Sequence, residues 1–257
     1  MSASAAAASA RGADSDGDLA PMSLSSAAES GAAAGDAGSG VSERGVDELL
    51  ADSAGALVQQ ALLPNAVWRV GLVASTIRKV ACACVLSLCQ RGLLPLHALG
   101  PVFGELAPVL AGCLGDDDAT TRHVACLAMA SMLSTLRGAL DGEAVRQLYP
   151  ELLKRLDDSN DAVRASGCRA IAALATAAAR PLDPGEGLAG TPGEFTIDTL
   201  LVHLDDPDAG LQAAVFESLQ PYVRLFPAHA RKALAVARAA HRHPGLCDRL
   251  LAFVNAL

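Results

Sequence analysis

Aromatic side chains are scarce in this sequence of 257 residues: Trp, Tyr and Phe make up 3% of it, against 51% hydrophobic residues overall. A core must therefore be built from Leu, Ala and Val. Ala and Leu favour helices, whereas β-sandwiches rely on β-branched and aromatic residues. No window shows the polar–apolar alternation of a half-buried strand. The sequence predicts an all-α fold.

Clusters of basic residues are also missing. The formal net charge is -8, and no run of Lys and Arg is present to bind phosphates. Long uncharged apolar runs are missing as well, because the window taken as most apolar, 162–179, contains Arg164 and Arg169. Arginine is costly at the centre of a bilayer. We therefore expect neither nucleic acid nor a membrane among the partners.

Large apolar side chains are almost absent from residues 1–45, which are mostly Ala, Ser, Gly and Asp. Such a segment cannot offset its ordering entropy, so we expect it to be disordered, with a folded array over 46–257. It lacks the apolar core of a secretory signal. Seven cysteines lie in apolar helical stretches. An odd count without a signal indicates reduced, buried thiols in a cytoplasmic protein.

Internal repetition is the strongest positive feature of the sequence. Three segments align, each ending one apolar helix, forming an acidic turn and opening a second helix: Leu114–Arg122, Leu156–Arg164 and Leu204–Gln212. Their last positions are 42 and then 48 residues apart, and a fainter copy ends at Arg78, 44 residues before Arg122. A period of about 40–47 residues with two helices per unit is typical of HEAT and armadillo repeats. We expect an α-solenoid of about four to five helix pairs.

The helix pairs are expected at 55–91, 102–138, 145–180, 195–225 and 228–257. The stretch from Pro181 to Gly193 is rich in Pro and Gly and is expected to be a loop insertion, which explains the longer repeat step. The last pair is short and carries a narrow apolar stripe, so we expect it to cap the array. Capping repeats keep the ends of a solenoid soluble.

The repeated polar residues have structural roles in this interpretation. Asp, Ser and Asn at the turns can accept hydrogen bonds from free N–H groups at the start of the following helix. An Asp and an Arg six residues apart resemble the HEAT consensus, in which such residues form a hydrogen-bonded ladder between neighbouring repeats. The structural positions are Arg78, Asp116, Arg122, Asp158, Arg164, Asp206 and Gln212.

The two ends of this ladder depart from the consensus. Gln212 replaces the basic residue in the last copy, and Leu72 stands at the acid position in the first. We therefore expect the ladder to be weakened at both ends. Three residues after the Arg position lies a small residue, where two helices can approach closely. Ala81, Ala125 and Gly167 fill this place, whereas Val215 predicts a wider gap in the last copy.

No catalytic, cofactor or metal site is predicted. None of the six histidines precedes a Glu, and metal-binding HEAT enzymes of the deoxyhypusine hydroxylase type use His-Glu pairs. His241, His243 and Cys247 form the one local cluster with potential ligands. Pro244 is expected to start a helix there, and no fourth ligand is visible. Without a phosphate loop or a nucleophile beside a base, the sequence does not indicate an enzyme.

Three stretches of the sequence carry a more specific resemblance. Leu148–Asp158, Leu200–Asp208 and the tail from Leu225–Pro227 through His243–Leu251 resemble the C-terminal repeats of the dynein axonemal assembly factor 5 family. The resemblance covers about Ala74 to the C-terminus. It implies a non-enzymatic, cytoplasmic HEAT-repeat scaffold that preassembles outer and inner dynein arms for motile cilia, with axonemal dynein chains and chaperones as partners.

Two other functions stay open at this point. One is a generic HEAT adaptor, in transport or tubulin binding, although the acidic turns would repel the acidic surface of tubulin. The other is a metal-dependent HEAT enzyme, for which metal analysis of the purified protein would be decisive.

Overall fold

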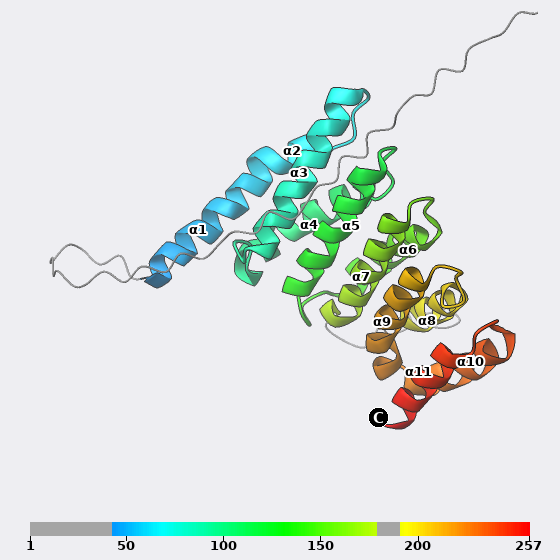
Figure 1. Cartoon of the computed structure of the whole chain (residues 1–257). Coiled ribbons are helices and arrows are strands. Elements are labelled where there is room, and N and C mark those ends of the chain that lie inside the picture. The colour runs from blue at the N-terminus through cyan, green and yellow to red at the C-terminus, as the bar shows by residue number, and fades with distance from the viewer. Residues whose placement is uncertain (1–42, 179–190) are drawn as a thin grey trace, which may run out of the picture. The chain divides into compact units, whose positions relative to one another are not determined.

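The computed structural model describes residues 43–178 and 191–257, which lie in one compact unit spanning Val41–Leu257 (Figure 1). Most of the segment expected to be disordered, residues 1–42, lies outside the described residues. So does most of the expected loop insertion, residues 179–190. Within the described ranges the fold is all-α, and its one β-type contact is an isolated bridge between Leu140 and Ala178.

Five helix pairs follow one another along the described chain. Their bounds are α1 Glu43–Leu57, continued by the π-helical turn Val58–Leu62 and α2 Leu63–Ala66, with α3 Leu72–Gln90; α4 Leu96–Cys113 with α5 Ala119–Thr135; α6 Gly142–Leu153, continued by the 3₁₀ turn Lys154–Asp157, with α7 Asp161–Ala177; α8 Pro192–His203 with α9 Ala209–Leu225; and α10 Pro227–Ala240 with α11 Gly245–Asn255. The expected number of pairs is thus present.

The first pair begins earlier than its expected bound at residue 55. Ala51, Ala54 and Val58 are buried at helical spacing, so α1 has an apolar stripe of mostly small residues. The expected array over 46–257 included this stretch, but the first helix pair was placed too late. The first residues of the described chain, 43–45, also belong to this helix and not to a disordered segment.

The expected loop Pro181–Gly193 ends sooner than predicted. Pro192 and Gly193 form the first turn of α8. The Thr191 side chain accepts a hydrogen bond from the Glu194 N–H, and the Glu194 carboxylate accepts one from the Thr191 N–H, each at 3.0 Å. This reciprocal capping box starts a helix, and proline is well suited to its first turn because the missing N–H would be unpaired there.

Two layers of helices result from the stacking of the pairs (Figure 1). The second helices of the pairs pack in the order α3, α5, α7, α9 and α11. The first helices α4, α6, α8 and α10 make smaller contacts with one another in the same order. The second helices are therefore the main joint between the first four pairs. At the last junction, α8 and α10 contact each other more extensively than α9 and α11 do.

Leucine and alanine dominate the core, in line with the scarcity of aromatic residues. The exception is Tyr222 of α9, which is fully buried and donates a hydrogen bond from its hydroxyl to the Ile171 carbonyl of α7 at 2.9 Å. Burial raises the pKa of this phenol. A buried tyrosine needs such an acceptor, so Tyr222 links the third and fourth repeats by a bond as well as by packing.

Candidate functional site: the turn ladder and the α8–α10 groove

The acidic turns share one local hydrogen-bond pattern. The aspartate two positions after each turn's leucine accepts from the N–H two residues further on, in the pairs Asp116 with Asp118, Asp158 with Asn160, and Asp206 with Asp208, at 3.0, 3.0 and 2.8 Å. The second polar residue caps the following helix, accepting from the N–H groups of Thr121, Val163 and Leu211. These bonds satisfy N–H groups that a helix start leaves unpaired.

Ion pairs then connect each turn to the preceding repeat. In each pair, a guanidinium near the start of one repeat's second helix bonds the aspartate in the next repeat's turn. The pairs are Arg78 with Asp116 at 2.6 Å, Arg122 with Asp158 at 2.7 Å, and Arg164 with Asp206 at 2.8 Å. We call this row the turn ladder and each pair a rung.

The middle rung has the most complete geometry. Arg122 donates from Nε and from Nη2 to the two oxygens of Asp158, both at 2.7 Å, and from Nη1 to the Asp116 carbonyl at 2.9 Å. The Arg122 hydrogen bond is the largest cause that lowers the pKa of Asp158. A bidentate pair of this kind is geometrically specific and stronger than a neutral hydrogen bond. Arg122 thus joins its own turn to the next one.

The N-terminal end of the turn ladder is not weakened, contrary to the sequence prediction. Arg78 and Asp116 form the most buried rung, with side chains 4% and 1% exposed. Because each arginine pairs with the aspartate of the following repeat, Arg78 needs no acid at position 72. Leu72 instead is 84% exposed, together with other apolar residues at the start of α3.

At the C-terminal end of the turn ladder, Gln212 in place of a basic residue does change the interactions between repeats. Gln212 donates to the Asp206 carbonyl within its own repeat at 2.8 Å, as Arg122 does to Asp116, but it makes no rung to the fifth helix pair. The fourth and fifth pairs are instead joined by Asp205, which accepts from Arg242 Nε at 3.1 Å. Nothing in the repeat alignment pointed to Arg242, which lies outside the repeated segments.

The small residues three positions after each arginine lie in the core, and Gly167 of α7 lies against the 3₁₀ turn of its own repeat. Ala81, Ala125 and Gly167 are all buried. A Cβ added to Gly167 would lie 2.9 Å from the Cβ of Arg155, which is too close without a shift. Val215 is also buried in the corresponding place, and α7 packs on α9 less extensively than on α5.

The remaining candidate ligands do not converge. In the described residues no group of three or more His, Cys, Asp and Glu side chains is placed to hold a metal ion. Within the predicted cluster, the Sγ of Cys247 lies 3.3 Å from Nδ1 of His241, and burial raises the pKa of that thiol. Cys84 and Cys89 are half-buried, whereas the other five cysteines are buried as the sequence indicated.

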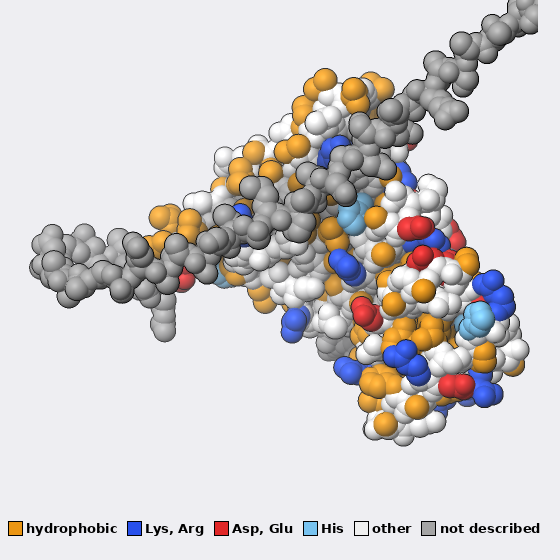
Figure 2. Space-filling view, in the orientation of Figure 1, with side chains coloured by type: hydrophobic (Ala, Val, Ile, Leu, Met, Phe, Trp, Pro, Cys, Tyr) orange, Lys and Arg blue, Asp and Glu red, His pale blue; other side chains and the backbone are white. Residues whose placement is uncertain are grey.

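Two described helices, α3 and α4, are long and apolar enough to cross a membrane by length and composition alone. The stretch expected to be most apolar, 162–179, includes neither helix. Both helices carry structural partners here: Arg78 of α3 pairs with Asp116, and α4 packs on α1, α2 and α5. Hydrophobic side chains gather at the end of the array where α2 meets α3 (Figure 2).

The first helices leave two grooves between them. One lies between α4 and α6, with a volume of about 440 Å³, and a larger one of about 650 Å³ lies between α8 and α10. Between α6 and α8 the rings of Tyr149 and Phe195 meet edge to face, with centroids 6.3 Å apart. This aromatic pair therefore lies between the two first helices that separate the two grooves.

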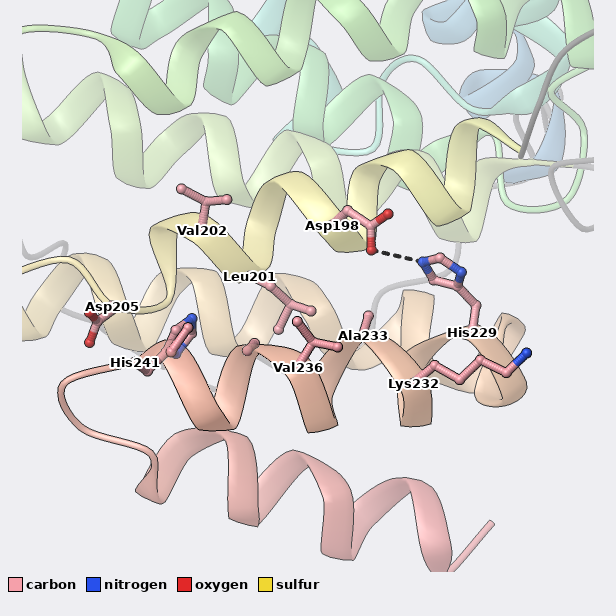
Figure 3. A pocket seen from close by; sticks show the side chains of 11 residues that line it. Asp198, Leu201, Val202, Asp205, His229, Lys232, Ala233, Val236 and His241 are labelled. Atoms are coloured by element: carbon pink, nitrogen blue, oxygen red, sulfur yellow. Dashed lines mark hydrogen bonds and ion pairs between the residues drawn. The ribbon is translucent and has the colours of Figure 1, made fainter.

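The groove between α8 and α10 has an apolar floor and polar ends (Figure 3). Its apolar lining comes from α8 and α10: Leu201, Val202, Ala233, Val236, Ala237 and Ala240. At one end His229 contacts Asp198 at 2.8 Å, and at the other Asp205 and His241 line the rim. We call this feature the α8–α10 groove.

A HEAT-like repeat family matches residues 121–174, from α5 through most of α7. The described array is a HEAT/armadillo-like solenoid. The crystal structure of an engineered protein superposes on this solenoid with a TM-score of 0.50 and 15% identity, over 83% of each chain, which bears on the fold alone.

Among curated proteins, dynein axonemal assembly factor 5 of Xenopus laevis is 32% identical over 204 residues, covering 78% of this chain and 24% of that protein. The Homo sapiens protein of the same name is 31% identical over 202 residues, covering 78% and 23%. The resemblance found in the sequence is confirmed by this similarity. The chain spans about a quarter of the length of these relatives.

Proposed function

We propose that this HEAT/armadillo-like solenoid is a non-enzymatic scaffold that helps assemble axonemal dynein. The observation that carries the proposal is the similarity to dynein axonemal assembly factor 5 across 78% of the chain. The array supports it physically, because stacked helix pairs present extended surfaces for other proteins. The turn residues that looked chemically active are used in caps and rungs, which is a structural role.

The expected setting is the cytoplasm, before outer and inner dynein arms enter motile cilia. The expected partners are dynein intermediate or heavy chains, together with chaperones that keep those chains soluble. The open surface between the first helices suits such partners, since the α8–α10 groove and the α4–α6 groove are apolar and accessible.

Quantitative pull-down from the cytosol of ciliating cells tests this function. The bait is the tagged chain, and the matched control is the same chain with Leu152→Asp, which places a charge at a fully buried position and should unfold the array. Dynein chains should be recovered with the folded bait only. Chaperones that persist on the control bind unfolded chain and do not count as assembly partners.

Absence of dynein intermediate and heavy chains from the folded bait would contradict the proposal and leave a generic adaptor role. Loss of the protein from the cell gives a second readout. Cilia should still form but should be immotile, with dynein arms depleted from isolated axonemes. Motile cilia with a full complement of arms would also contradict it.

A further inference from the structure

The fully charged side chains that line the α8–α10 groove differ in sign between its two walls: Asp198 and Asp205 lie on the α8 side and Lys232 lies on the α10 side. Helix α8 carries Glu194 and Asp198 and no Lys or Arg, and Asp205 follows it. Helix α10 carries Arg231, Lys232 and Arg238 and no acid. Helices α3 and α5 also lack carboxylates, but α10 combines this lack with three basic residues.

Most of these charged side chains already have a hydrogen-bond or ion-pair partner. One charge on each wall stays available for a further partner. Arg231 donates to the Val254 carbonyl at the end of α11, and Arg238 pairs with Asp248. Lys232, exposed on the rim, has no ion pair among the described residues. On the facing wall, Asp198 has only His229 as a partner, and its side chain is 55% exposed.

Between these charges the groove exposes apolar surface that a folded protein normally covers. Val202 is 73% exposed and Val236 is 72% exposed, above a floor that includes the buried Leu201. Figure 3 shows α8 and α10 running side by side, with Leu201 directed toward α10 and Lys232 extending along the rim. Exposed apolar residues bordered by charged ones are typical of protein-binding sites.

The shape of the groove favours a helix as its occupant. Both walls are helices, so no strand edge is available for an added strand, and an amphipathic helix can lay its apolar face between them. The 12 residues of α8 provide a wall about 18 Å long, which matches about three turns of a bound helix. The few polar groups lie at the ends and do not converge on one point, as they would around a small ligand.

We propose that the α8–α10 groove binds one amphipathic helix of a partner protein, whose apolar stripe is flanked by basic residues facing α8 and acidic residues facing α10. Opposite charges on the two flanks fix the orientation of the bound helix, as flanking charges do in coiled coils. This inference concerns the surface only, and its test does not depend on dynein assembly.

Selection from a displayed library of 20-residue amphipathic helices, with apolar positions fixed and both flanks randomised to Glu, Lys or Gln, tests the proposal on the full chain. Peptides recovered with the wild-type chain should carry acids on one flank and bases on the other. Val202→Glu should weaken their binding about tenfold or more, the loss expected for a central contact. The matched control Val73→Glu, on an equally exposed valine of α3, should leave binding unchanged.

The substitution Lys232→Glu tests the charge assignment separately. It should remove the preference for acids on one flank and leave the preference for bases on the other. Circular dichroism of each variant should match that of the wild type, because the altered side chains are exposed.

Three results would overturn the proposal. The first is the absence of any peptide whose binding depends on Val202, and the second is selection of the same charge on both flanks. The third is occupation of the groove by this chain itself. That would be seen as a dimer that Val202→Glu makes monomeric, or as binding that emerges only after removal of residues 1–42.

Discussion

Removal of Arg122 is the most direct test of the turn ladder. The Asp158 side chain is 4% exposed in the wild type, and in the variant Arg122→Ala it would lose both of its 2.7 Å bonds to the guanidinium. Its remaining partners would be the Asn160 N–H at 3.0 Å and Arg155 at 3.4 Å. Breaking a buried pair costs about 3–5 kcal/mol, and the remaining Arg155 reduces our expectation to about 2–3 kcal/mol.

A double-mutant cycle isolates this rung from other effects of the substitutions. Arg122→Ala, Asp158→Ala and the double variant should give a coupling energy of about 1.5 kcal/mol or more. The matched control is the exposed pair Glu151 and Lys154, whose side chains are 39% and 58% exposed. Its coupling should be below about 1 kcal/mol, as for other surface pairs.

Native-state hydrogen exchange is the appropriate assay, because the repeats of a solenoid do not have to unfold as one unit. The rung joins α5 to the turn before α7, so amide exchange should increase in α5 and at the start of α7, and less in α11. A coupling energy no larger than that of the surface control would refute the idea that the rungs hold the repeats together.

Other predictions follow from single contacts. Gly193→Ala should destabilise the chain by about 1–3 kcal/mol, since the added Cβ would lie 2.2 Å from the Phe226 ring; in thermal unfolding, Gly104→Ala in α4, with nothing within 4 Å, should be neutral or stabilising. Thr191→Ala removes the capping box and should cost about 1 kcal/mol in urea unfolding, with faster exchange at the start of α8; an unchanged midpoint would contradict the role of the cap. The pKa of Asp158 lies below its usual value of 3.8, so its stabilisation is complete above that pH and is lost as the pH falls further. A pH series of unfolding should show this loss, and Asp158→Asn should flatten it.

The helical array could be predicted from the sequence because each repeat carries the same local turn pattern. An acidic turn of the type Leu156–Arg164 marks a helix end, a cap and a helix start within nine residues, and three copies fix the period. The start of the array was predicted within three residues, but the first helix pair was placed too late, at residue 55, where α1 has a buried stripe of alanines such as Ala51 and Ala54. Small residues pack closely without a strong hydropathy signal.

The sequence identified the residues of the turn ladder but not which of them pair with one another. The spacing of Asp and Arg within one repeat identifies both partners, yet the bond runs from Arg122 to the aspartate 36 residues later. That direction depends on how one repeat stacks on the next, and it reverses the expectation for Arg78 at the first rung. The similarity to dynein assembly factors, in turn, came from specific segments and not from periodicity.

The α8–α10 groove was missed because it belongs to two repeats at once. A signal for it does exist in the sequence: 227–243 contains four Lys or Arg residues and no acid, close to the acidic stretch 194–208. Only the stacking of α10 on α8 places these segments on facing walls. The exposure of Val202 and Val236 depends on the same stacking and could not be read from their neighbours in the chain.

The substitution of Gln212 for an arginine has a consequence for this groove. Helix α8 belongs to the fourth pair and α10 to the fifth, so the groove spans the junction at which Gln212 makes no rung. Beyond the packing of α10 and α11, its walls are linked by Asp198 with His229 and by Asp205 with Arg242, and in each pair one side chain is more than half exposed. Such pairs weaken as ionic strength rises. The fourth and fifth pairs therefore lack a rung of the turn ladder, and a helix bound across α8 and α10 would add contacts between them.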